Sequence, residues 1–247
     1  LKLLPEGSRP PVLFVGNENL QSEIETLLSP LTALYKTANI RPSLDHQNLG
    51  PAEAALGVLL FEIQAKKLQG LEQLNRLAET RLMHNAQAFG RTVRFLSTVI
   101  DAPKGILGTD LGASSTTIAS SFAGELEVRN FPELGMGRSL NGMLAETQLQ
   151  QITRWLPEDL PEEFVLDYLY NKTLLPNTLP STPQELASEM AAARQVVRLA
   201  VGKSLGMFPA NAIYPLMGTV PWFARILVAG STLARHPRPA QRLLAVL

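Results

Sequence analysis

The sequence has no cysteine, no net charge and no histidine cluster among its 247 residues. Without cysteine the chain forms neither disulfides nor thiolate zinc sites, and cysteine nucleophile chemistry is excluded. The three histidines stand far apart, which argues against a multi-histidine metal centre: His46, His84 and His236. The 22 basic and 22 acidic side chains leave no basic surplus for phosphate backbones, so we expect no nucleic acid partner.

A hydrophobic run suited to crossing a membrane is also lacking. Residues 210–234 carry a single charged side chain, Arg225, but two prolines interrupt them. A charge within the apolar layer would add a cost of about 3 kcal/mol. We therefore interpret this stretch as buried segments of a soluble protein and expect no membrane partner. The absence of cysteine suits a cytoplasmic location.

The first hundred residues show the pattern of an α/β protein. Two short apolar runs, residues 11–16 and 32–37, flank a segment with helical spacing, which indicates a β-α-β unit. Pro51 then opens a long helix that continues to about Leu68. Further helical segments reach about Val99.

The pattern changes near residue 102, where helical spacing gives way to β-like alternation. Three short runs follow one another: residues 105–111, 116–122 and 125–131. Their short connections predict an antiparallel meander. Later, Thr182, Pro183 and Glu185 have the order of a capping box at a helix start, and residues 225–229 read as another strand.

The connection between the first two β-like runs has the composition of a phosphate-binding turn. Asp110 ends the first run, and small or hydroxyl-bearing residues follow: Gly112, Ala113, Ser114, Ser115 and Thr116. Small residues let backbone N–H groups approach phosphate oxygens, and the hydroxyls add further donors. Asp110 could hold magnesium through water or orient an attacking water. An ordinary hairpin with a small polar turn explains the spacing equally well.

Two segments resemble turns of the superfamily that joins actin, heat-shock chaperone ATPases and sugar kinases. Residues 110–116 (DLGASST) look like its phosphate hairpin, and residues 226–233 (ILVAGSTL) are similar to its adenosine-binding turn. Gly230, Ser231 and Thr232 form that second turn, with Ser231 in place of a usual second glycine. The resemblance implies ATP and magnesium as ligands, with Asp110 as the catalytic residue that holds the metal through water.

Most of the chain resembles the MutL/GlmL proteins associated with glutamate mutase, which are unrelated to mismatch-repair MutL. The segments that carry this resemblance are VLFVGN at 12–17, NIRPSL at 39–44, DLGASSTTIAS at 110–120 and ELGMGR at 133–138. The resemblance implies an actin-like ATPase that serves a cobalamin-dependent mutase as a chaperone or reactivating factor.

The same resemblance implies an α/β fold of the actin-like, ribonuclease-H-like type. Residues 1–102 would finish the first lobe, and residues 103–247 would form most of the second lobe, with a helical insertion at about 149–202. The first residue is Leu1 and no upstream phosphate hairpin is seen, so we expect a fragment of a longer, two-lobed protein.

Two departures from the family pattern support an alternative function. The second acidic residue of the hairpin falls at Thr117, which cannot share a magnesium charge or act as a base near pH 7. The second glycine of the adenosine-binding turn falls at Ser231. A further departure is the family's Pro-Thr-Pro segment, which is replaced by His84-Asn85-Ala86. The alternative is a catalytically inactive, actin-like interaction or scaffold module, and both hypotheses stand at this point.

Overall fold

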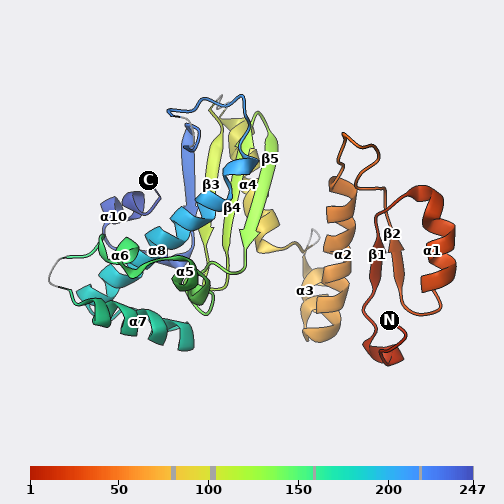
Figure 1. Ribbon diagram of the computed structural model, residues 1–247, viewed down its shortest axis with the longest axis horizontal. Helices are drawn as coiled ribbons and strands as arrows, with labels where there is room; N and C mark the ends of the chain where they lie inside the picture. Colours follow the sequence, from red (N-terminus) through yellow and green to blue (C-terminus); the bar gives the residue numbers. More distant parts are fainter. Residues whose placement is uncertain (79–81, 101–103, 158–159, 217–218, 247) are drawn as a thin grey trace. The chain divides into compact units, whose positions relative to one another are not determined.

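The computed structural model of the protein (Figure 1) describes five stretches of the chain: residues 1–78, 82–100, 104–157, 160–216 and 219–246. The chain divides into two units, Leu1–His84 and Asn85–Leu247. Both units contain helices and strands, which confirms the expected α/β class.

Unit 1 is built around a pair of parallel strands. Its elements are η1 (Glu6–Ser8), β1 (Val12–Phe14), η2 (Glu18–Leu20), α1 (Gln21–Leu28), β2 (Leu34–Lys36), α2 (Gly50–Lys67) and α3 (Leu71–Leu77). β1 and β2 run parallel, with Leu13 opposite Tyr35, and α1 connects them. The expected β-α-β unit is therefore confirmed. Pro51 lies in the first turn of α2, as the sequence predicts.

Unit 2 contains a four-stranded mixed sheet. Its strands are β3 (Ile106–Leu111), β4 (Thr116–Phe122), β5 (Glu125–Phe131) and β6 (Arg225–Ala229), in the order β5-β4-β3-β6. β4 is antiparallel to both β3 and β5, which confirms the meander. β6 runs parallel to β3, so the carboxyl ends of these two strands lie at the same edge of the sheet.

Two long helices cover opposite faces of this sheet (Figure 1). On one face, Val93 of α4 (Asn85–Val99) packs with Ile106 and Ala119. On the other face, α8 (Pro183–Lys203) joins a larger core that includes Leu111 and Ile118. Successive strand residues point to opposite faces, so each strand contributes to both clusters.

The remaining helices of unit 2 are shorter. They are α5 (Leu140–Glu146), α6 (Leu149–Thr153), α7 (Glu162–Leu174), η3 (Leu205–Met207), α9 (Ser231–Ala234) and α10 (Pro239–Leu244). In the described parts of the chain, no helix is long and apolar enough to span a membrane.

The division between the units falls between His84 and Asn85, earlier than the boundary expected at residue 102, which itself lies outside the described residues. The physical reason is α4: this helix packs against β3, β4 and β5 and so belongs with the sheet. The assignment of the two parts to lobes of an actin-like protein stays a prediction.

A capping box begins α8, as the sequence predicts. The Thr182 hydroxyl accepts a hydrogen bond from the Glu185 backbone N–H at 3.1 Å, and Glu185 Oε2 accepts one from the Thr182 N–H at 3.1 Å. The same oxygen also accepts the backbone N–H of Ser181 at 2.6 Å. These bonds favour the charged carboxylate, so they lower the pKa of Glu185, with the Ser181 backbone bond as the largest cause.

We expect Glu185→Gln to lower the melting temperature at pH 7 and to have no effect in strong acid. A lowered pKa in the folded state stabilises the fold above the ordinary glutamate value of 4.5, and this stabilisation disappears as the pH falls through the lowered pKa. Thermal melts of both proteins between pH 7 and pH 2 measure the gap. Glu163→Gln, in the first turn of α7, is the matched control. A gap that stays constant with pH would contradict the prediction.

Candidate functional site

The two turns singled out in the sequence meet at the carboxyl edge of the unit 2 sheet. The hairpin of residues 112–115 follows β3, and Gly230 follows β6, the parallel neighbour of β3. A Cβ atom added to Gly230 would lie 2.0 Å from the carbonyl oxygen of Leu111, so the two backbones are in direct contact. This edge of a parallel strand pair is where α/β proteins commonly bind ligands.

The carbonyl groups of the hairpin of residues 112–115 accept hydrogen bonds from the segment that follows β5. Three hydrogen bonds do this: Met136 N–H to the Gly112 oxygen at 2.9 Å, Gly137 N–H to the Ala113 oxygen at 2.8 Å and the Ser139 hydroxyl to the Ser114 oxygen at 2.8 Å. Within the hairpin, the Gly112 N–H donates to the Ser115 oxygen at 3.0 Å. In the described part of the chain, no hydrogen bond uses the amides of residues 113–115. Backbone N–H groups that have no hydrogen-bond acceptor within the protein can bind an anion.

The hairpin side chains divide between surface and core. Ala113 and Ser114 are exposed and Ser115 is half-buried, so both serine residues reach the surface. Thr116 is fully buried, and its hydroxyl has no hydrogen-bond partner among the described residues. The expected surface hydroxyl of Thr116 is therefore not found, because this side chain points from β4 into the sheet–helix core.

Asp110 lies half-buried near the end of β3, with Thr117 opposite on β4 and Ala229 opposite on β6. Its Oδ2 atom accepts a hydrogen bond from the Asn85 side-chain amide at 2.8 Å. Asn85 is the first residue of α4, and the start of a helix favours a negative charge. The carboxylate is thus oriented through one oxygen, which leaves the other for a water or ligand.

Sequence reasoning missed Asn85 as a partner of Asp110. The available signal was the segment His84-Asn85-Ala86, which stands where the MutL/GlmL pattern has Pro-Thr-Pro. That difference marked the segment as a departure but did not indicate which distant strand it would contact.

Thr117 occupies the family's second acidic position, and its hydroxyl is hydrogen-bonded to a neighbouring side chain. It is buried, and its hydroxyl donates to the Asn130 side-chain oxygen at 3.0 Å. Across the described ranges, no group of three or more acidic or histidine side chains could hold a metal. Among Asp110 and its two strand neighbours, Thr117 and Ala229, only Asp110 has a carboxylate that could contact a metal ion.

The second turn combines a glycine of positive φ with a short helix. Gly230 has φ +96° and precedes α9. Ser231 is exposed, whereas Thr232 is half-buried and its hydroxyl donates to Glu189 Oε1 at 3.3 Å. Of the two hydroxyls expected at this turn, one reaches the surface and the other is engaged within the protein.

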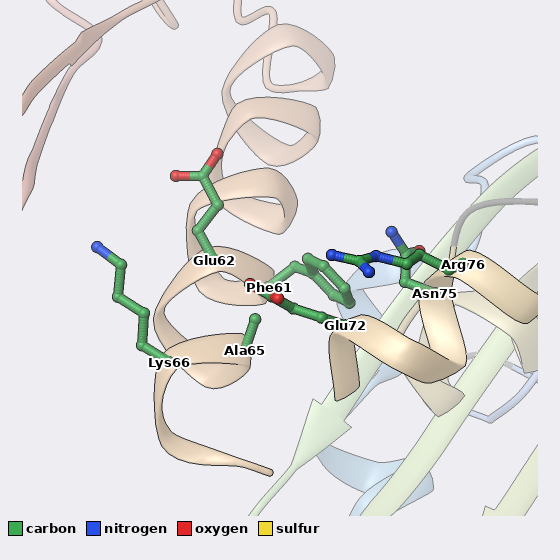
Figure 2. Close-up of a pocket in the computed structure, with 7 residues that line it drawn as sticks. All are labelled: Phe61, Glu62, Ala65, Lys66, Glu72, Asn75 and Arg76. Atoms are coloured by element: carbon green, nitrogen blue, oxygen red, sulfur yellow. The ribbon is translucent and has the colours of Figure 1, made fainter. Parts of the chain in front are cut away.

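A separate cavity of about 420 Å³ lies in unit 1 (Figure 2). Phe61 and Ala65 of α2 face α3, while Glu62 and Lys66 extend away from it. The other lining residues are Glu72, Asn75 and Arg76 of α3. Because Glu62 and Lys66 point away from the opening, its charged lining residues do not gather into one site for a charged ligand.

Together, the fold and the sheet edge define an α/β protein with two small-residue turns beside a single oriented carboxylate. A family model described as MutL protein matches residues 2–247. The chain therefore belongs to the MutL family, that of the glutamate mutase-associated protein, which confirms the resemblance identified in the sequence. No curated protein matches the chain.

Proposed function

We propose that this MutL-family protein binds ATP with magnesium at the carboxyl edge of β3 and β6. The observation that carries the proposal is the close approach of Gly230 to the backbone of Leu111, the residue that directly precedes the hairpin of residues 112–115. An adenine nucleotide needs hydrogen-bond donors for its phosphates and a backbone surface without bulky side chains against which its nucleoside can pack. The two must lie close enough for one nucleotide to reach both. Two turns that follow adjacent parallel strands, each rich in small residues, would provide both.

Each part of the edge would have its own role. The amides of residues 113–115 and the hydroxyls of Ser114 and Ser115 would hold phosphate oxygens, with Thr116 contributing its backbone. Gly112 fits close packing here, since a Cβ atom would lie 2.9 Å from the Ser115 oxygen. Gly230 and Ser231 would support adenosine. Asp110, oriented by Asn85, would hold a metal-bound water, and the bound magnesium would neutralise phosphate charge.

The wider role we propose is that of an actin-like chaperone or reactivating factor for a cobalamin-dependent mutase. Family membership supports the link to glutamate mutase. The meander that carries the hairpin supports the actin-like, ribonuclease-H-like fold. Nucleotide binding would drive movement between lobes, and this movement would act on the mutase.

Calorimetric titration of the protein with magnesium-ATP tests the proposal. We expect saturable binding, and we expect Asp110→Asn to weaken the magnesium-dependent part of the affinity about 10- to 100-fold, as loss of an outer ligand does. Asp167→Asn removes an exposed carboxylate from α7 and should bind like the wild type. Absence of binding at millimolar magnesium-ATP would overturn the proposal.

Thr117 favours a second candidate function, a scaffold that keeps the fold without hydrolysis. Its neutral hydroxyl lies directly opposite Asp110 and is bonded to Asn130, so Asp110 is the one carboxylate in this row of the sheet. Phosphate release and mutase binding separate the two functions. A scaffold would release no phosphate, and its binding to a cobalamin-dependent mutase would be the same in the Asp110→Asn variant. An ATPase would lose turnover in that variant.

A further inference from the structure

Glu189 of α8 is a buried carboxylate that contacts the Gly230 turn. The residue is 6% exposed. Its Oε1 atom accepts the Thr232 hydroxyl at 3.3 Å, and its Oε2 atom accepts the Tyr168 hydroxyl at 2.6 Å and the Lys172 ammonium at 3.1 Å. One carboxylate thus joins α9, which follows Gly230, to α7.

The two α7 residues that contact Glu189 are themselves held in place. Tyr168 and Lys172 are four residues apart, so they lie on the same face of α7, and both are buried. Lys172 also donates to the backbone oxygen of Thr178, beyond the end of the helix. Burial, and then the hydrogen bond to Glu189, raises the pKa of Tyr168, so its hydroxyl remains a donor throughout the physiological range.

The turn needs such support because α9 is too short to be stable alone. It spans Ser231–Ala234, and it is closed by hydrogen bonds from Ala234 N–H to the Gly230 oxygen at 2.8 Å and from Arg235 N–H to the Ser231 oxygen at 3.0 Å. A single helical turn does not form in water without tertiary contacts. The Thr232 hydroxyl lies within that turn and is bonded to α8.

We infer that Glu189 is the positioning residue of the Gly230 turn and that Thr232 is the side chain through which it acts. This inference rests on the proposed function, because the turn it positions is the one we propose for adenosine. Thr232 then orients the turn from inside, and Ser231 and the Gly230 backbone face the nucleotide. Tyr168 and Lys172 hold Glu189 in the orientation that reaches Thr232.

The test uses variants on both sides of the Glu189–Thr232 contact. Thr232→Val removes the hydroxyl and keeps the shape, and Thr232→Ser keeps the hydroxyl. On the other side, the apolar set replaces the buried network as a unit: Tyr168→Phe, Lys172→Met and Glu189→Leu together. The full chain is measured by amide hydrogen exchange without nucleotide, read at Ala234 and Arg235, and by calorimetric titration with magnesium-ADP.

We expect Thr232→Val and the apolar set each to speed exchange at Ala234 and Arg235 about tenfold, the effect of losing a hydrogen bond to a charged group. Combining them should add nothing further, since both remove the same contact. Thr232→Ser should behave like the wild type. Magnesium-ADP affinity should fall about tenfold in the same variants. Exchange at Leu96, in α4 on the other face of the sheet, should not change.

Unchanged exchange in Thr232→Val, or effects that add in the combined variant, would overturn the positioning role of Glu189. A wild-type protein that binds no magnesium-ADP would instead overturn the proposed function. The two failures are distinct because the exchange measurement needs no nucleotide.

Discussion

Gly230→Ala should lower the melting temperature of unit 2 by roughly 6–12 °C and should also abolish the nucleotide binding that we propose. The glycine has φ +96°, which strains any other residue by about 1–3 kcal/mol. In addition, a Cβ atom would lie 2.0 Å from the oxygen and 2.7 Å from the carbonyl carbon of Leu111. Both are backbone atoms of β3, so the contact cannot be relieved by a rotamer change. A loss of about 3 kcal/mol in a unit of this size gives the stated shift.

Calorimetry of the variant measures the transition, and Gly202→Ala is its control. Gly202 lies in the last turn of α8, where an added Cβ atom meets nothing within 4 Å. Alanine favours a helix over glycine by up to about 1 kcal/mol, so this control should melt at or slightly above the wild-type temperature. A Gly230→Ala protein with wild-type stability would show that the turn does not approach Leu111 as closely as described.

Local features of this fold were predictable from the sequence because their causes are local. The meander follows from short alternating runs with tight connections, and the capping box at Thr182 follows from side chains three residues apart. Pairing between distant segments has no such signal. The strand at 225–229 was predicted, but its parallel pairing with β3, which joins the two turns, depends on contacts across more than a hundred residues.

In the candidate site, too, the sequence does not predict which distant residues a given side chain contacts. Thr116 and Thr117 are neighbours with similar chemistry, yet alternation along β4 sends the first into the core beside Leu111 and sets the second opposite Asp110. Which face each would occupy depends on how the helices pack on the sheet. Asn85 and Glu189 were missed for a related reason, because their partners lie on other elements and neither belongs to a motif.

Lys172→Met should destabilise unit 2 by about 3–5 kcal/mol, the usual cost of leaving one member of a buried ion pair without its partner. The Lys172 and Glu189 side chains are only 6% and 8% exposed, and their charged atoms are 3.1 Å apart. Among the described residues Glu189 forms no other ion pair, so removing the ammonium leaves its buried carboxylate without a counter-charge there. Urea denaturation monitored by circular dichroism measures the loss.

Two comparisons show whether that cost comes from burial. Lys203→Met removes a lysine whose side chain is 34% exposed and which pairs with Glu133 and Glu146 at the surface, so it should cost less than about 1 kcal/mol. The apolar set defined above removes both buried charges and should recover most of the stability lost in Lys172→Met. If it remains as unstable as Lys172→Met, the pair itself stabilises the fold.

Recovery of stability by the apolar set would show whether the buried network of Tyr168, Lys172 and Glu189 is needed for stability. A buried charge pair that can be replaced without loss of stability is not needed to hold α7 against α8. What the network still provides is a directional hydrogen bond, because the Glu189 carboxylate accepts the Thr232 hydroxyl of α9. Leucine at position 189 cannot accept this bond. An apolar set that is as stable as the wild type but binds magnesium-ADP about tenfold more weakly would therefore show that the network positions the Gly230 turn rather than stabilising the core.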